Sequence, residues 1–527
     1  MGRFAPWAHR AAGAAVRSAA RRREKASRIG KTSSVRVRVE LPLTPTLAHR
    51  PPLGKGGRPG RAAARRRPDR RDSFPPTSAA PRTRHIGGLL TQPTGRDADR
   101  ALRKSLGVRE LTASIITITI GGGVFLLPSG VAGALGAAAW VAYIACAAVF
   151  GLIVMCFAEA GSRVEASGGP YAYVEKAFGP FVGYLSGVLV LIFGTIAHAA
   201  VAAGFTQAVN ALVPGAGEGI ARIGVILVVF GFFTFINLRG VGQGARLVEI
   251  GTVAKLLPLV FIGTVGLFAI KGANLAWPGM PAVGDLTRAC MTLMFAFFGV
   301  ETALVPSGEV RDPARTVPRS ILYGVGAITL LYLGVQQSAQ GILGPELANY
   351  KDAPLAAAAE RGFGAWAGLV LKVGAAISMV AHTSGMMLAM PRSVFAMARD
   401  GFLPRALARV NPTTQVPSLA ILAYAGVVTL LAATGTFASL VVLANIAALL
   451  MYLLCCLGVI GLRRRGVRLA AEPFTIPGGA IVPWLATAAI LALLSTSNVA
   501  EIRAIGIALA VSVVLYFIRA RTAGAAA

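Results

Sequence analysis

Three consecutive glycines, Gly121, Gly122 and Gly123, are the first residues in the chain whose spacing suggests chemistry. They lie within a long apolar run. Each glycine costs about 1 kcal/mol relative to alanine in a helix interior, so a helix that only crosses a bilayer gains nothing from three of them. A break at this point would leave backbone N–H and C=O groups unpaired at a depth that water does not reach. Such groups can hold a small zwitterion, and the stretch therefore predicts a binding site made of main chain.

The composition of the chain indicates a membrane protein. Of its 527 residues, 55% are hydrophobic and 14% are charged, whereas soluble domains carry about 25% charged residues. No Asp, Glu, Lys or Arg occurs in residues 111–158 or 320–345, and about 20 such residues cross a bilayer once. We therefore expect an all-α, polytopic membrane protein whose helices are surrounded by lipid.

Twelve apolar segments follow residue 105 and predict twelve transmembrane helices. Their spans are 108–132, 137–160, 173–210, 219–237, 246–270, 287–308, 319–342, 364–395, 416–433, 437–461, 480–496 and 499–519. With the N-terminus in the cytoplasm, 18 of the 26 Lys and Arg residues after residue 104 fall in inside loops and 6 fall in outside loops. This bias follows the positive-inside rule and predicts that both termini are cytoplasmic.

Residues 1–104 differ from the rest of the chain. They carry 26 basic and 6 acidic residues, which is +20 of the total charge of +30. Their Arg, Pro, Gly and Ala content, without sustained periodicity, predicts a disordered basic tail. Three origins stay open: a lipid-binding arm, an organelle transit peptide, or translated DNA upstream of the true start, which the abrupt change near Ser105 favours. The tail alone would also suggest nucleic acid as a partner, but the remainder of the chain does not.

A second interruption mirrors the first in the sixth apolar segment, at Phe295-Ala296-Phe297-Phe298-Gly299. Because five crossings separate the two, the halves of the chain would run in opposite directions through the bilayer. Paired broken helices in corresponding positions are typical of inverted-repeat transporters with a site at the midplane. We therefore predict a 5+5 inverted repeat with breaks in helices 1 and 6. The transport core would cover residues 105–462, and helices 11 and 12 with a short tail would cover residues 463–527.

These motifs resemble those of the amino acid-polyamine-organocation family of permeases over about residues 105–520. The glycine stretch with Phe125 is similar to the break in the family's first helix, although Gly122 stands where the family often has Ser or Ala. Three further similar motifs follow in order: Glu159 through Gly168-Gly169-Pro170-Tyr171, Gly308-Glu309-Val310-Arg311-Asp312-Pro313, and Ala398-Arg399-Asp400-Gly401-Phe402.

The resemblance implies a permease of the bacterial inner (plasma) membrane that moves amino acids by proton symport or exchange, as a monomer or a homodimer. In the family, N–H groups of broken helix 1 hold the substrate carboxylate, and carbonyls of helices 1 and 6 hold its ammonium. The corresponding substrate-binding residues here are Ile120, Gly121, Gly122, Gly123, Phe295, Ala296, Phe297, Phe298 and Gly299. Phe295 is the expected aromatic gate. The alternative is that the glycines only permit close helix packing.

Two charged side chains inside apolar segments are candidate coupling residues. Lys255 lies near mid-segment, where a charged lysine costs about 2.5–3.5 kcal/mol on insertion scales. The resemblance implies that the Lys255 ammonium replaces a bound cation and bridges helices 1 and 8. The alternative is that its side chain snorkels to the membrane surface. We expect snorkelling for Lys372, which lies nearer its helix end. Glu301 directly follows the second break, and it could carry protons or act as a structural hydrogen-bond partner.

Charged residues are also expected to form the ion pairs of a cytosolic gate, by the same resemblance, with ordinary solvated loop charges as the alternative. They are Glu309, Arg311, Arg399 and Asp400. His198 and His382 lie in apolar segments, where a satisfied core histidine is more common than a proton relay.

Other function classes fit the sequence less well. No Walker A stretch is present, so we do not expect ATP to drive transport. No His-Glu-x-x-His motif marks a membrane-embedded enzyme, and the five cysteines lack metal-ligand spacing, so neither a metal nor a cofactor is expected. Two alternatives to an amino acid transporter stay open: a polyamine or cationic amino acid antiporter, and an amino acid sensor on a transporter fold.

Overall fold

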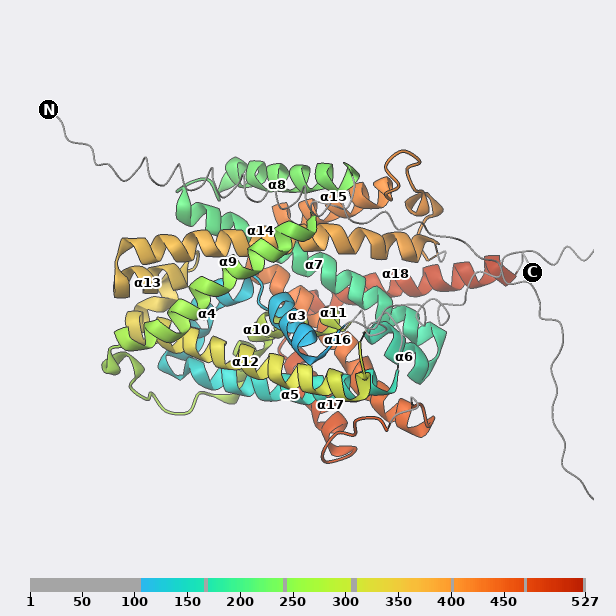
Figure 1. Ribbon diagram of the computed structural model, residues 1–527, viewed down its shortest axis with the longest axis horizontal. Coiled ribbons are helices and arrows are strands. Elements are labelled where there is room, and N and C mark those ends of the chain that lie inside the picture. Colours follow the sequence, from blue (N-terminus) through green and yellow to red (C-terminus); the bar gives the residue numbers. More distant parts are fainter. Residues whose placement is uncertain are drawn as a thin grey trace, which may run out of the picture. The chain divides into compact units, whose positions relative to one another are not determined.

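The computed structural model describes residues 106–164, 169–239, 244–304, 310–399, 402–468 and 472–524. Within these ranges the regular elements are all helices, as the composition predicts (Figure 1). Eight of the described helical stretches are long and apolar enough to cross a bilayer, and three shorter apolar helices accompany them. The predicted basic tail, residues 1–104, lies outside the described residues.

The glycine stretch interrupts the first apolar segment at the predicted place. α3 (Val108–Thr119) ends before Ile120, whose φ of −74° and ψ of 90° are extended rather than helical. α4 (Gly123–Leu135) starts a new helix three residues later. The first apolar segment is therefore two short helices joined by three residues of non-helical chain.

The sixth apolar segment is interrupted in the same way. α10 (Val283–Phe297) ends before Phe298, whose φ of −68° and ψ of 148° are extended. α11 (Val300–Ala303) follows Gly299, which has a φ of 133°. L side chains rarely adopt this conformation, so a glycine is required here.

The remaining apolar helices surround these two broken ones. They are α5 (Ala139–Arg163), α7 (Pro180–Leu212), α8 (Gly219–Arg239), α9 (Gly244–Thr264), α12 (Pro313–Leu343), α14 (Ala365–Arg399), α15 (Ser418–Thr434), α16 (Phe437–Arg464), α17 (Ile481–Leu494) and α18 (Val499–Gly524). α4 packs against α10, and α3 packs against α11 and α12. The halves of the two broken helices are thus neighbours, although their breaks lie far apart in the sequence.

The third apolar segment was predicted as one helix over 173–210, and this was wrong. α6 (Pro170–Phe178) ends at Gly179, which has a φ of 96°, and α7 then begins at Pro180. Glycine just past a helix end and proline at the first helical position are the usual signals for these two places. The sequence carries both signals, and Glu175 and Lys176 precede them, but the long apolar run that follows Pro180 dominated the prediction.

One helix was not predicted at all. α13 (Pro354–Phe363) lies between α12 and α14, and its ten residues are too few for a crossing. Its buried residues are Pro354, Leu355 and three alanines, and the helix packs against α14 and α12. A search for long apolar runs missed this short helix because its apolar stretch, residues 354–359, ends at Glu360 and Arg361.

α9 and α12 approach each other closely enough for their backbones to touch. A Cβ atom added to Gly334 of α12 would lie 2.4 Å from the carbonyl oxygen of Gly263 of α9. Small residues at such a contact let membrane helices gain van der Waals packing that larger side chains would prevent. Gly334 is therefore required by the α9–α12 contact, whereas Gly326 on the same helix has no atom within 4 Å of an added Cβ.

We expect Gly334→Ala to lower the free energy of unfolding by about 1–3 kcal/mol, the usual cost of overpacking. Gly326→Ala is the matched control. It should be neutral or stabilising, because alanine in a helix interior stabilises the fold by about 0.5–1 kcal/mol relative to glycine. The measurement is the melting temperature of each variant in detergent, followed as loss of monodisperse protein. Equal melting temperatures would contradict the α9–α12 contact.

Candidate functional site

The two helix breaks lie directly against each other. A Cβ atom added to Gly299 would lie 2.8 Å from both the backbone nitrogen and the Cα of Thr119, at the end of α3. A Cβ added to Gly123, at the start of α4, would lie 3.5 Å from the Cα of Ala296. The structure thus brings together the predicted residues Gly123, Ala296 and Gly299, and the 2.8 Å approach at Gly299 leaves no room for a side chain there.

Buried polar atoms without hydrogen-bond partners gather around this contact. Among the described residues, they include the hydroxyl of Thr119 and Oε1 of Glu301. The Thr119 hydroxyl would lie 2.9 Å from a Cβ on Gly299. Most buried polar atoms in proteins are paired, so each unpaired atom needs an explanation. A polar ligand or water held between the breaks would supply the missing partners.

The face of α14, the eighth predicted segment, completes the first break. The resemblance implies that helices 1 and 8 are neighbours at Lys255, but the contacts of Ser378, Met379 and His382 were not predicted. The hydroxyl of Ser378 lies 3.5 Å from the carbonyl oxygen of Gly121, to which it donates. A Cβ on Gly121 would lie 3.9 Å from Nδ1 of His382, and a Cβ on Gly122 would lie 3.3 Å from Cε of Met379. Nε2 of His382 is buried without a partner in the described part of the chain. The spacing of these α14 residues, about one helical turn, was the available signal.

Lys255 of α9 contacts the end of α3. Its side chain is 6% exposed, and Nζ donates to the carbonyl oxygen of Thr117 over 2.6 Å. The helical partner of that carbonyl would be the N–H of Gly121, which lies past the end of α3, so the break leaves the carbonyl open. A cation at a helix C-terminus is also favoured by the helix dipole. Lys372, expected to snorkel, pairs with Glu360 over 3.8 Å instead.

Glu301 is hydrogen bonded on one of its two oxygens. Oε2 accepts from the backbone N–H of Gly299 over 3.0 Å and from the hydroxyl of Tyr452 over 2.6 Å. The carboxyl group therefore supplies a partner for an N–H group that the second break exposes, and it joins this break to α16. Tyr452 lies 151 residues further along the chain, and no local pattern marked it.

Phe295 is the aromatic residue nearest the first break. Its Cδ1 lies 3.1 Å from the position of a Cβ on Gly123. On its other side it meets Phe437 of α16 edge to face, with ring centroids 6.0 Å apart. Phe295 thus covers the break from one side, where the sequence predicts an aromatic gate.

The other two predicted phenylalanines pack away from that position. Phe297 is fully buried and lies between Phe150 and Tyr332, with centroid distances of 5.6 and 5.4 Å. Phe298 meets the rings of Phe193 and Tyr452. Both are packing residues in this structure.

The carbonyl oxygen of Ala296 was expected to be free for a ligand. It accepts a hydrogen bond from the hydroxyl of Tyr332 over 2.8 Å. A carbonyl oxygen has two lone pairs, so one acceptor position is left for a second donor.

Half of the predicted cytosolic gate lies outside the described residues, namely Glu309 and Asp400. Past residues 305–309, which lie outside the described residues, the N–H of Arg311 donates to the carbonyl oxygen of Leu106 over 2.9 Å. Arg399 is the last residue of α14.

A buried charge cluster that the sequence did not predict links three elements. The carboxylate of Glu159, fully buried at the end of α5, accepts from Arg463 of α16 at 2.7 and 2.5 Å. It also accepts from Arg163 at 2.9 Å and from the backbone N–H of Ile476 at 3.0 Å. One carboxylate therefore holds α5, α16 and the chain before α17 together.

We expect Glu159→Gln to destabilise the protein by about 3–5 kcal/mol, because it leaves two arginines beside a neutral group. Glu346→Gln is the control. It removes a carboxylate whose ion pair with Arg361, at 2.9 Å, is about half exposed on both sides, and such pairs contribute about 0–1 kcal/mol. Melting temperatures in detergent would test this, and equal values for both variants would show that the Glu159 cluster does not stabilise the fold.

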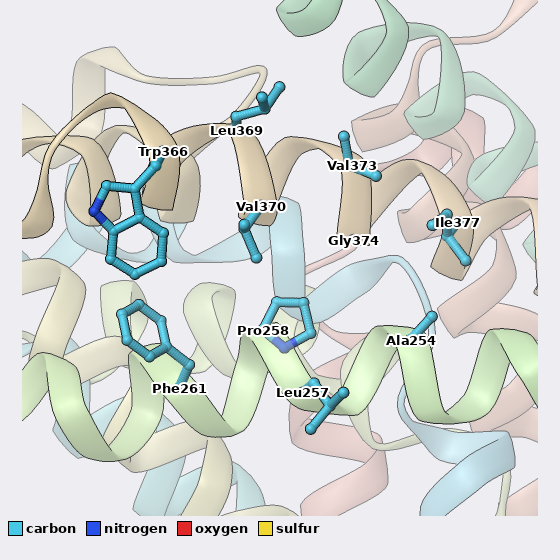
Figure 2. A pocket seen from close by; sticks show the side chains of 10 residues that line it. All are labelled: Ala254, Leu257, Pro258, Phe261, Trp366, Leu369, Val370, Val373, Gly374 and Ile377. Atoms are coloured by element: carbon cyan, nitrogen blue, oxygen red, sulfur yellow. The ribbon is translucent and has the colours of Figure 1, made fainter. Parts of the chain in front are cut away.

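A groove with a volume of about 560 Å³ lies between α9 and α14 (Figure 2). The lining side chains, among them Pro258, Phe261 and Ile377, are apolar except for the indole N–H of Trp366. Trp366 is 60% exposed. A single neutral donor cannot hold both charges of a zwitterionic ligand, so the contact between the breaks is the better candidate site.

Comparison with known proteins agrees with this geometry. The amino acid permease family matches residues 106–518. The branched-chain amino acid permease BcaP of Bacillus subtilis is 25% identical over 84% of this chain and 97% of its own length. The serine/threonine exchanger SteT of the same organism is 29% identical over 61% of this chain and 75% of its own length. An uncharacterized transporter of Mycobacterium tuberculosis, Rv1999c, is 30% identical over 68% of this chain and 80% of its own length. With two contacting helix breaks and a match across most of its length, this chain belongs to the amino acid permease family.

Proposed function

We propose that this permease is a secondary transporter that carries α-amino acids across the cytoplasmic membrane by alternating access. The contact between the two breaks supports this proposal most directly. The first turn of α4 leaves N–H groups without helical partners, and the dipole of α4 favours a carboxylate there. Carbonyls at the ends of α3 and α10, including those of Gly121 and Ala296, would accept from the ammonium.

The side chains around the breaks favour neutral amino acids. Phe295 lies against Gly123 and Met379 lies against Gly122, and both are apolar. The one carboxyl group beside the second break, that of Glu301, already binds Gly299 and Tyr452. Its Oε1 alone has no partner among the described residues, so one carboxylate oxygen remains there for a cationic group, whereas a polyamine carries at least two such groups. The names of BcaP and SteT point in the same direction, since both refer to amino acids without a charged side chain.

Lys255 is the proposed coupling residue. Its hydrogen bond to Thr117 ties α9 to the broken helix. Loss of the proton from Nζ would remove the charge that this carbonyl attracts, so proton release and movement of α3 would be linked. Proton symport follows if the proton leaves in each cycle. Exchange follows if the lysine stays charged as a fixed cation.

The proposed architecture is twelve crossings in a 5+5 inverted repeat, with both termini in the cytoplasm. The paired breaks and the distribution of Lys and Arg support it. Alternating access would then move the helices that carry the breaks relative to α7 and α14, exposing the site first on one side and then on the other.

Uptake into proteoliposomes tests the function and the role of Lys255. Wild-type protein should take up neutral amino acids faster with an inward proton gradient, and Lys255→Ala should reduce this uptake about tenfold or more, as expected for loss of a hydrogen bond to a charged group. Lys372→Ala is the control, because its amine pairs with Glu360 and is 28% exposed.

The outcomes separate the alternatives. Uptake that requires amino acid inside the vesicles, and ignores the proton gradient, would identify an exchanger. Ligand-induced thermal stabilisation without flux would identify a sensor. Uptake of polyamines or cationic amino acids alone would contradict the proposal that the substrates are neutral. Equal uptake by wild type and Lys255→Ala would show that Lys255 has no role in coupling.

A further inference from the structure

The apolar groove between α9 and α14 is a built feature of the surface that the proposed transport mechanism does not use (Figure 2). Its volume of about 560 Å³ lies within the roughly 300–1,000 Å³ of ligand pockets. Six of its lining side chains are more than a third exposed, namely Leu257, Trp366, Leu369, Val370, Val373 and Ile377. The groove is therefore open to the medium around the helices, which in a membrane protein is lipid.

The floor of the groove lies where α9 and α14 touch. A Cβ on Gly374 would lie 2.6 Å from Cγ of Pro258, and both residues are buried. Because Gly374 has no side chain and the Pro258 ring is short, nothing rises from this contact to fill the groove. The hollow is therefore a consequence of how the two helices pack.

Aromatic rings close one end of the groove. Trp366 of α14 faces Phe261 of α9, with ring centroids 5.7 Å apart, and Phe261 also meets Phe363 at 5.2 Å. Figure 2 shows the two facing rings at the end opposite Ile377 and Ala254. Tryptophan is enriched at the level of lipid headgroups, where its ring is in apolar surroundings and its N–H reaches polar groups. The position of Trp366 at the start of α14 fits this level.

The groove has the length of one lipid leaflet. From Trp366 to Ile377, α14 rises about 16 Å at roughly 1.5 Å per residue. One leaflet contributes about 15 Å to a hydrocarbon core of roughly 30 Å. The groove thus runs from the membrane surface at Trp366 to the middle of the bilayer at Ile377, and the positive-inside rule predicts that this surface is the outer one.

A lipid acyl chain fits the groove better than protein does. A second copy of the chain would bring its own α9–α14 face, and two concave faces placed together leave both hollows unfilled. The N-terminal 104 residues carry 26 basic residues, and such charges are costly within the bilayer. An acyl chain is uncharged, narrow and of matching length.

Shape decides whether a chain prefers the groove to the surrounding lipid. Lipid tails are as apolar as the lining residues, so exclusion of water gives no preference. A chain in the groove is contacted by α9, by α14 and by the floor between them. It gains dispersion contacts that a chain against a single convex helix lacks, and it exchanges more slowly for that reason.

We infer that the groove between α9 and α14 is a binding site for one acyl chain of a phospholipid, whose headgroup lies at Trp366 and whose methyl end lies at Ile377. The site borders the residues that hold the first break, since Ala254 precedes Lys255 and Ile377 precedes Ser378. The bound chain therefore supports the two helices that contact the broken helix. The inference does not depend on the proposed transport function.

Fluorescence quenching by brominated lipid tests the site, because bromine quenches tryptophan on contact. The full-length protein would keep Trp366 as its only tryptophan, with Trp7, Trp140, Trp277 and Trp484 changed to Phe. It would be reconstituted in phosphatidylcholine with brominated chains and then washed in detergent micelles. We expect Trp366 to keep at least half of its quenching after the wash, and to lose it when unlabelled phosphatidylcholine is added in excess.

The position of the bromines tests the orientation of the chain. Bromines near the ester end should quench Trp366 at least twice as strongly as bromines near the methyl end, because the headgroup lies at this residue. The reverse order would contradict the orientation that we infer.

Trp484 of α17 is the matched control. It is 56% exposed, against 60% for Trp366, and it lies outside the groove. As the only tryptophan of the protein, it should be quenched in the bilayer and recover almost completely in the wash, because it contacts lipids that exchange freely.

A second experiment fills the groove. Val370→Phe with Val373→Phe adds two rings to its lining, and the control, Val228→Phe with Val427→Phe, adds the same rings to exposed positions of α8 and α15. After the same wash, native mass spectra should show one phospholipid on the wild-type protein and on the control, and none on the groove variant. Misfolding of the groove variant would leave the Trp366 experiment intact, since that protein has an unaltered groove apart from its label.

The inference is overturned if Trp366 and Trp484 recover equally in the wash, because the groove would then hold only ordinary boundary lipid. It is also overturned if brominated lipid leaves Trp366 unquenched in the bilayer, which would indicate a second copy of the chain on this face. Retention of the phospholipid by a folded groove variant is the third contrary result. Absence of transport would concern the proposed function alone, since every readout here is lipid binding.

Discussion

The structure depends on the contact between two helix breaks. Gly299 can lie against the backbone of Thr119 because it has no side chain and because its φ of 133° is open to glycine. The same contact brings Gly123 next to Ala296. Surrounding helices then have to provide what the breaks lack, since unpaired backbone groups are costly in an apolar medium. The positions of α9, α14 and α16 around the breaks follow from this requirement.

The two buried ionisable groups near the breaks are best understood as partners of the main chain. Lys255, a potential cation, binds a carbonyl oxygen at the end of α3, and Glu301, a potential anion, binds an N–H group at the second break. Each sign matches the partial charge of the group it meets. A role in coupling does not compete with this structural role, because a change in the proton content of either side chain would alter the hold on the broken helix.

The sequence predicted what depends on local pattern. The glycine run and Gly299 located both breaks, the apolar runs located most helices, and the mid-segment position of Lys255 identified a buried charge. Partners distant in sequence could not be predicted, because apolar periodicity does not reveal which helices touch. Tyr452 and Ser378 are examples, and Glu159 binds an arginine 304 residues away. The split at Gly179 and Pro180 was readable from these two residues and from Glu175 and Lys176 before them, but the long apolar run that follows outweighed these signals.

The close approach of Gly334 to Gly263 has a mechanical consequence. Around this backbone contact, Leu331 and Val335 of α12 each lie 3.2 Å from the position of a Cβ on Gly263. The two helices therefore interlock, and a shift of one along the other would require repacking. The contact between α5 and α16 is held differently, by two hydrogen bonds from Arg463 to the Glu159 carboxylate. Each pair of helices is thus joined through a single residue, a glycine in one case and a carboxylate in the other, and each pair is expected to move as a unit.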